Sequence, residues 1–166
     1  MLSSIAAHAA IIVFVSVNVA VAITDLTCMK IGNGFILALL VSYLICAPLA
    51  GLSFDAMAAS GLIALCTLVV ASILFGFGWI GGGDAKLVAV TSLWMGNYAT
   101  HEYLVTAAII GLGLTIAVMI ARSYRTWLAP YWPLSAKILM KGEGVPYGAA
   151  LALSALMTIS NTFWVP

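Results

Sequence analysis

The sequence predicts an all-α membrane protein with six transmembrane helices. Of its 166 residues, 64% are hydrophobic and only 7% are charged, and the mean hydropathy is +1.20. Soluble domains carry roughly 25% charged residues, so this composition indicates a chain embedded in a bilayer. Nearly all Lys and Arg residues also fall between apolar segments, as expected for the ends of membrane helices.

Six apolar segments define the expected helices, because a membrane-spanning helix needs about 20 mostly apolar residues. The expected spans are Ile5–Thr24, Phe35–Leu52, Ala56–Trp79, Ala85–Tyr98, Tyr103–Ala121 and Val145–Val165. The first follows an N-terminus without the basic residues of a secretory signal, so we expect it to be retained. No soluble domain or internal repeat interrupts the series. We therefore expect a single membrane-embedded domain over residues 1–166.

Turn and capping signals mark where several spans begin. The pair Asn33–Gly34 is a turn signal before the second span. Asp55 fits an N-cap of the third span and Glu102 suits the first turn of the fifth, because carboxylates accept hydrogen bonds from the free N–H groups of a helix start. The glycines Gly81–Gly83 precede the short fourth span, where they allow a tight turn.

The positions of the basic residues predict the orientation in the membrane. Every Lys and Arg lies in the first, third or fifth connection between spans or, for Lys86, at the start of the span that follows the third: Lys30, Lys86, Arg122, Arg125, Lys137 and Lys141. Cytosolic connections are enriched in Lys and Arg. We therefore expect these connections to be cytosolic and both termini to lie outside.

The connection Arg122–Gly144 contains Trp127, Tyr131 and Trp132 among prolines and basic residues. Such a mixture is typical of a segment that lies in the lipid headgroup layer. Docking of a substrate is the alternative interpretation. Membrane lipid is the expected partner on the first interpretation.

Several functions are disfavoured by composition. A net charge of +1 gives no basic surface for nucleic acid. Cys28, Cys46 and Cys66 form no Cys-x-x-Cys pair, and His8 and His101 have no His-Glu-x-x-His spacing. The sequence therefore predicts no metal site, no bound cofactor and no nucleic-acid partner.

Asp25 and Asp84 are the two acids expected at the cytosolic ends of membrane helices, where ionisable groups are functional candidates. Asp84 could simply cap the fourth helix. Asp25 lies at the C-terminal end of the first helix, where the helix dipole offers a carboxylate no stabilisation. If the two carboxylates approach each other, their repulsion favours one protonated and one ionised group. Such a pair could polarise a peptide carbonyl and activate water, and Gly81–Gly83 would leave room for an extended peptide backbone.

Three motifs resemble those of the type IV prepilin peptidases, a family of membrane aspartyl proteases. Gly81–Asp84 contains the family's G-x-G-D motif. Asp25 is followed by Ile31–Asn33, which reads Ile-Gly-Asn where the family has Ile-Pro-Asn. Pro146–Gly148 resembles the Pro-Tyr-Gly segment that starts the last helix of the family. A pair of aspartates in this order on six apolar segments makes the resemblance specific.

The resemblance implies a G-x-G-D protease fold, with Asp25 and Asp84 as the catalytic residues. It implies a prepilin substrate, whose cytosolic leader is cleaved at the bacterial inner membrane while its hydrophobic helix lies beside the enzyme. The short peptidases of Flp/Tad pilus systems are the most similar group, because nothing here matches the cysteine-paired domain linked to N-methylation. The substrate-binding residues expected on this basis are Gly81, Gly82, Gly83, Lys86, Asn33, Pro146 and Tyr147.

Two functions of other classes remain open at this point. A small proton or ion carrier would use the acids as a relay, although a relay should offer acids at several depths. A non-catalytic assembly partner of a pilus or secretion system would use both acids only for caps and turns. The distance between the two carboxylates would discriminate these functions from a protease.

Overall fold

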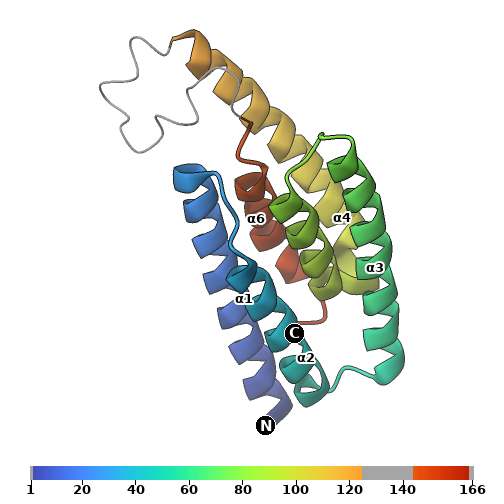
Figure 1. Ribbon diagram of the computed structural model, residues 1–166. Helices are drawn as coiled ribbons and strands as arrows, with labels where there is room; N and C mark the ends of the chain where they lie inside the picture. Colours follow the sequence, from blue (N-terminus) through green and yellow to red (C-terminus); the bar gives the residue numbers. More distant parts are fainter. Residues whose placement is uncertain (1, 125–143, 165–166) are drawn as a thin grey trace.

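The computed structural model describes residues 2–124 and 144–164, and the described residues form helices without any strand. In chain order the elements are α1 (Leu2–Cys28), α2 (Asn33–Ala50), α3 (Phe54–Gly76), α4 (Gly82–Ser123), α6 (Tyr147–Thr158) and the short 3₁₀ helix η2 (Ile159–Asn161). The helices lie side by side as a bundle (Figure 1). The all-α prediction is thus confirmed for the described residues.

Four helices of the described chain are long and apolar enough to cross a membrane. They are Ser3–Cys28, Asn33–Ala50, Phe54–Gly76 and Gly82–Ser123. Large apolar side chains such as Ile12, Leu65 and Leu112 are exposed on the outside of the bundle. Such an apolar exterior is suited to contact with lipid, since it has no favourable partner in water.

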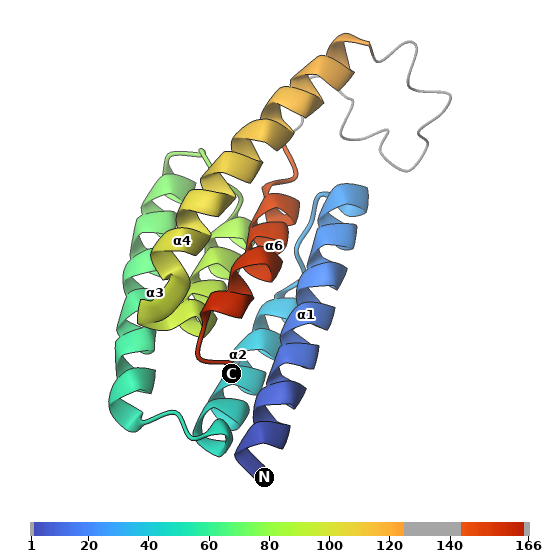
Figure 2. The same ribbon diagram turned by 180° about the vertical axis from the view of Figure 1, so that it is seen from behind.

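The expected fourth and fifth spans both lie within α4. Its backbone is non-helical at one residue, Gly96, where φ is 55° and ψ is −151°. Figure 2 shows two arms of α4 that run in opposite directions on either side of this break. The expected break after Tyr98 and before Tyr103 was therefore wrong in position, because the residues between them are helical.

The last helix is shorter than expected. The sequence predicted a span over Val145–Val165, whereas α6 ends at Thr158 and η2 follows it. At 1.5 Å per residue, the 12 residues of α6 cover less than the ~30 Å hydrocarbon core. The predicted length of this span was wrong, and a count of six full spans remains a prediction.

An aromatic cluster holds α4 against α1 and α2. The ring of Trp94 lies 5.0 Å from that of Phe14, 5.7 Å from that of Tyr43 and 4.8 Å from that of Trp164. Its indole N–H donates to the carbonyl of Leu39 at 3.0 Å. Buried aromatic pairs stabilise a fold beyond their buried area, so this cluster fixes the first arm of α4 in the bundle.

One end of the bundle gathers segments that are distant in sequence. The end of α1, the start of α2, the turn between α3 and α4, and the start of α6 all lie at this end, opposite the N-terminus (Figures 1 and 2). This arrangement brings Asp25, near the end of α1, to the same end as Asp84, near the start of α4.

Candidate active site

Asp25 lies in the last turn of α1 and is almost completely buried, with 5% of its surface exposed. Its backbone carbonyl accepts a hydrogen bond from the N–H of Met29 at 2.9 Å. Met29 has a φ of 52°, in the left-handed region, so the helix ends here. The side chain of Asp25 thus leaves α1 at its final turn, beside the neighbouring helices.

The carboxylate of Asp25 caps α6. Its Oδ2 accepts a hydrogen bond from the N–H of Ala149 at 2.9 Å, and Ala149 is the third residue of α6. Pro146, at the N-cap position of α6, makes no side-chain hydrogen bond to the helix. The expectation that a structural carboxylate gains little at the position of Asp25 was therefore wrong, because the N-terminus of a different helix, α6, supplies the positive end of a dipole.

Asp84 occupies the first turn of α4. Its Oδ2 accepts a hydrogen bond from the N–H of Gly81 at 3.2 Å, which is one half of a capping box. The capping interpretation of Asp84 is confirmed in this form. Asp84 is half-buried, and it also lines a cavity.

The two carboxylates lie at the same end of the bundle, because Gly83, next to Asp84, and Gly148, beside Asp25, both pack against Ile31. Each of them also holds the N-terminus of a helix, Asp25 that of α6 and Asp84 that of α4. Helix N-termini stabilise negative charge. The site therefore combines two acids with two helix N-termini that stabilise their negative charge.

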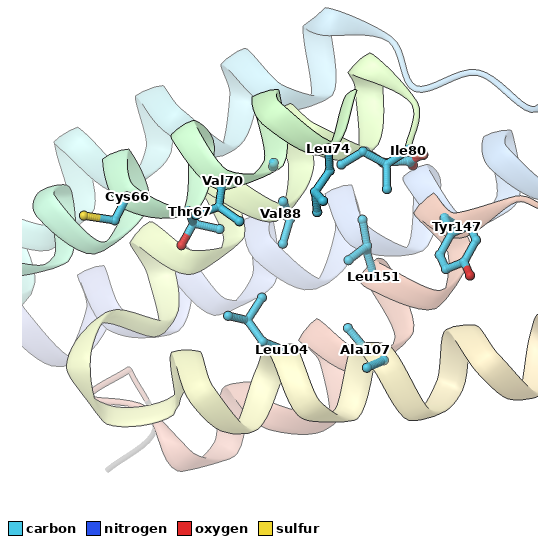
Figure 3. Close-up of a pocket in the computed structure, with 13 residues that line it drawn as sticks. Cys66, Thr67, Val70, Leu74, Ile80, Val88, Leu104, Ala107, Tyr147 and Leu151 are labelled. Atoms are coloured by element: carbon cyan, nitrogen blue, oxygen red, sulfur yellow. The ribbon is translucent and has the colours of Figure 1, made fainter. Parts of the chain in front are cut away.

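A cavity of about 410 Å³ borders Asp84. Figure 3 shows it between α3, both arms of α4 and α6, with Ile80 and Tyr147 at one end and Cys66 at the other. Leu74 and Leu151 are among the apolar side chains along its wall. Apart from Asp84, Tyr147 and a few small groups, the lining is apolar, so the cavity suits a hydrophobic chain.

Tyr147 is held at the end of this cavity by two residues of the second arm of α4. Its hydroxyl lies 3.2 Å from the hydroxyl of Thr115, in hydrogen-bond distance. A β-carbon at Gly111 would lie 2.8 Å from the Cε1 atom of Tyr147. Sequence reasoning missed both Gly111 and Thr115, because their only signal is contact with a residue more than 30 positions away.

Lys86 and Asn33 are brought together at the same end of the bundle. The Lys86 ammonium donates to Oδ1 of Asn33 at 3.0 Å, and both side chains are exposed. This bond ties the first turns of α4 to the start of α2. Pro146, by contrast, is fully buried, which favours a role in placing α6.

The three glycines before Asp84 all pack closely against the protein itself. A β-carbon would lie 2.8 Å from Oδ2 of Asp84 at Gly81, 3.3 Å from the ring of Phe75 at Gly82, and 3.1 Å from Cβ of Ile31 at Gly83. None of the three has a positive φ, unlike Gly78 in the same turn. Internal packing therefore gives a reason for these glycines that the sequence alone did not reveal.

The sequence predicts no metal site. Among the described residues, no group of three or more His, Cys, Asp or Glu side chains is placed to hold a metal ion.

Arg122 donates to the carbonyl of Gly144 at 2.7 Å, which ties the end of α4 to the segment before α6. The interpretation of Trp127, Tyr131 and Trp132 as headgroup contacts lies outside the described residues.

A helical bundle with several apolar, membrane-length helices and a pair of acids at one end defines a class of multi-pass membrane protein. The type IV leader peptidase family matches residues 12–117, more than half of the chain. The chain belongs to this family, and the resemblance stated above is confirmed. The matched region includes both Asp25 and Asp84 but ends before α6. No curated protein and no solved structure matches the chain.

Proposed function

We propose that this chain is an aspartyl endopeptidase that removes the cytosolic leader of type IV prepilins, with prepilins of Flp/Tad-type pili as the favoured substrates. The observation that carries the proposal is the placement of Asp25 and Asp84 at one end of the bundle, where Asp25 binds the start of α6 and Asp84 caps the start of α4. Asp84 also borders an apolar cavity. Membership of the leader peptidase family supports the same substrate class.

The proposed chemistry uses one ionised and one protonated aspartate. The ionised carboxylate takes a proton from water, and the resulting hydroxide adds to the scissile carbonyl carbon. The protonated carboxyl donates to the carbonyl oxygen, where negative charge develops. The tetrahedral intermediate then returns its proton to the carboxylate that donated it, and the C–N bond breaks. The departing amine takes the proton that the other carboxylate had removed from water.

The hydrophobic helix of the prepilin would lie against the bundle beside Asp84, with part of it in the cavity. This placement brings the residues just before the helix to the two aspartates. Tyr147 lines the cavity and would contact the substrate. Gly81–Gly83, Lys86 and Asn33 surround the approach to Asp84, and Pro146 would act by fixing α6.

We further propose that the active site faces the bacterial cytosol and that the protein cleaves without N-methylation of the new N-terminus. The positions of Lys30, Lys86 and Arg122 in or beside the expected cytosolic connections support the cytosolic face. A leader made in the cytosol then reaches the site directly.

A second candidate function is that of a non-catalytic assembly partner. The observation that favours it is that each aspartate already has a structural partner at a helix N-terminus. Asparagine separates the two functions, because Asn caps helices about as well as Asp but cannot act as a proton donor and acceptor pair.

The first prediction is that Asp25→Asn and Asp84→Asn each lower prepilin cleavage by about 10³-fold or more, while thermal stability in detergent changes little. Residues that act as one unit lose little more when both are removed, so the double variant should resemble the singles. The assay uses a purified type IV prepilin with its leader and hydrophobic helix intact.

Asp55→Asn is the matched control, because Asp55 is exposed in the first turn of α3, where Ser53 provides the cap. It should cleave at the rate of the unmodified protein. Substantial cleavage by Asp25→Asn or by Asp84→Asn would exclude the two aspartates as a catalytic pair and would leave the assembly function.

A further inference from the structure

The short connection between α1 and α2 is fastened to both helices that carry the candidate catalytic acids. At its start, the N–H of Met29 donates to the carbonyl of Asp25 at 2.9 Å. At its end, Asn33 accepts from Lys86 at 3.0 Å, and Lys86 lies two residues after Asp84. The connection therefore joins the two halves of the site through short, direct contacts.

Ile31, in the middle of this connection, contacts the backbone on both sides of the site. A β-carbon at Gly83, the residue before Asp84, would lie 3.1 Å from Cβ of Ile31 and 3.6 Å from its Cγ1. A β-carbon at Gly148, in the first turn of α6, would lie 2.5 Å from Cδ1 of Ile31. The side chain of Ile31 thus fills the space between the N-termini of α4 and α6.

These two N-termini are the ones that hold the carboxylates. The start of α4 carries Asp84, and the start of α6 binds Oδ2 of Asp25 through Ala149. A side chain that separates the two helix starts also sets the separation of the two carboxylates. Ile31 is half-buried and packs against the hydrophobic core, so its position is itself fixed.

We propose that Ile31 is a positioning residue that holds Asp25 and Asp84 at the separation needed to act on one peptide bond. This proposal rests on the proposed function. Ile31 touches neither the water nor the scissile bond in this account; it acts through Gly83 and Gly148. Its β-branched side chain suits the task, because few rotamers are open to it.

The test is the rate of cleavage by Ile31→Ala and Ile31→Val on the same purified prepilin. Loss of all atoms beyond Cβ removes the contact with Gly148 and part of the contact with Gly83. A misplacement of about 1 Å can cost about 100-fold in rate, so we expect kcat of Ile31→Ala to fall about 10- to 100-fold. KM should stay within about threefold, because the cavity that binds the hydrophobic helix is untouched.

Ile31→Val keeps Cγ1 and loses only Cδ1, the atom that faces Gly148. Its kcat should therefore lie between those of the unmodified protein and Ile31→Ala, with a thermal midpoint close to normal, since only one buried methyl group is lost. This variant keeps the proposal testable if Ile31→Ala folds poorly. An unchanged kcat in folded Ile31→Val and Ile31→Ala would overturn it.

Ile36→Ala is the matched control. Ile36 is also half-buried against the core, five residues after Ile31 in the first turn of α2, so its truncation costs comparable packing without reaching Gly83 or Gly148. Its kcat should be unchanged. An equal fall in kcat for Ile36→Ala would show a general packing effect and would reject Ile31 as a positioning residue. An active Asp25→Asn or Asp84→Asn would instead reject the proposed function, whatever Ile31 does.

Discussion

Gly148, in the first turn of α6, lies against the carboxylate of Asp25. A β-carbon there would lie 2.9 Å from Oδ2 and 3.0 Å from Cγ of Asp25, in addition to its clash with Ile31. Gly148 does not have a positive φ, so the requirement is one of space alone. The absence of a side chain lets the Asp25 carboxylate reach the free N–H groups at the start of α6.

The prediction for this position is that Gly148→Ala lowers the cleavage rate about 10- to 100-fold, because a carboxylate displaced by even 1 Å loses its alignment. Overpacking should also lower the free energy of unfolding by about 1–3 kcal/mol. The measurements are kcat on a purified prepilin and thermal unfolding in detergent.

Gly113→Ala in α4 is the control for this substitution, because nothing lies within 4 Å of a β-carbon there. Alanine is favoured over glycine in a helix by about 1 kcal/mol, so this variant should be as stable as the unmodified protein or more so. A Gly148→Ala protein with normal kcat would mean that Asp25 tolerates displacement.

At the residue scale, the sequence identified both aspartates but not their partners. Asp25 and Asp84 were selected as candidates because they lie at the expected cytosolic ends of membrane segments, whereas Asp55 and Glu102 were expected at the outer ends. The amide that binds Asp25 belongs to Ala149, 124 positions away. Periodicity and turn signals describe neighbours in sequence, so they carry no information about this contact or about Ile31.

Among the elements, α4 departs most from the prediction. Its reversal depends on Gly96, and Thr100 donates to the carbonyls of Gly96 and Ser92 across the break. The conformation at Gly96 is essentially restricted to glycine. A β-carbon there would also lie 2.7 Å from the hydroxyl oxygen of Ser60.

Gly96→Ala should therefore lower the thermal stability of the protein. Backbone strain costs about 1–3 kcal/mol, and the contact with Ser60 adds to it. Gly61→Ala, which meets nothing within 4 Å in the adjacent α3, should be neutral. The measurement is the midpoint of thermal unfolding in detergent for each variant. Equal midpoints for Gly96→Ala and Gly61→Ala would contradict the role of Gly96 in the reversal of α4.

The length of α6 could not be read from hydropathy. The apolar run Val145–Val165 has the length of a span, but α6 buries small residues such as Ala149, Ala152 and Ala155. Hydropathy responds in the same way to a residue that faces lipid and to one that packs against another helix. It therefore predicted a helix correctly here and placed its end wrongly.

For the whole molecule, the distribution of charge along the bundle agrees with the expected orientation. Lys30 and Lys86 belong to the end that holds the two aspartates, whereas Asp55 lies at the start of α3, at the opposite end (Figure 1). A cytosolic leader can meet the aspartates only if their end faces the cytosol. The proposed function therefore depends on the orientation, which labelling can measure.

The last prediction concerns this orientation. In a variant with Cys28, Cys46 and Cys66 replaced by alanine, single cysteines are introduced by Asp55→Cys or Lys30→Cys; both positions are exposed. A membrane-impermeant thiol reagent should label Asp55→Cys in intact spheroplasts, because the positive-inside bias places that end outside. Lys30→Cys should react only after the membrane is opened with detergent, a step that also verifies that its thiol is accessible.

His101→Cys gives an independent measurement at a second position, because His101 lies in α4 shortly after the break at Gly96, is also exposed and has no Lys or Arg nearby in the sequence. It should label as Asp55→Cys does. Labelling of Lys30→Cys in intact spheroplasts, with Asp55→Cys protected, would place Asp25 and Asp84 on the outer face. An outer site could not reach a leader before the prepilin crosses the membrane, so cleavage of a cytosolic leader by this aspartate pair would then be excluded even if both aspartates proved essential.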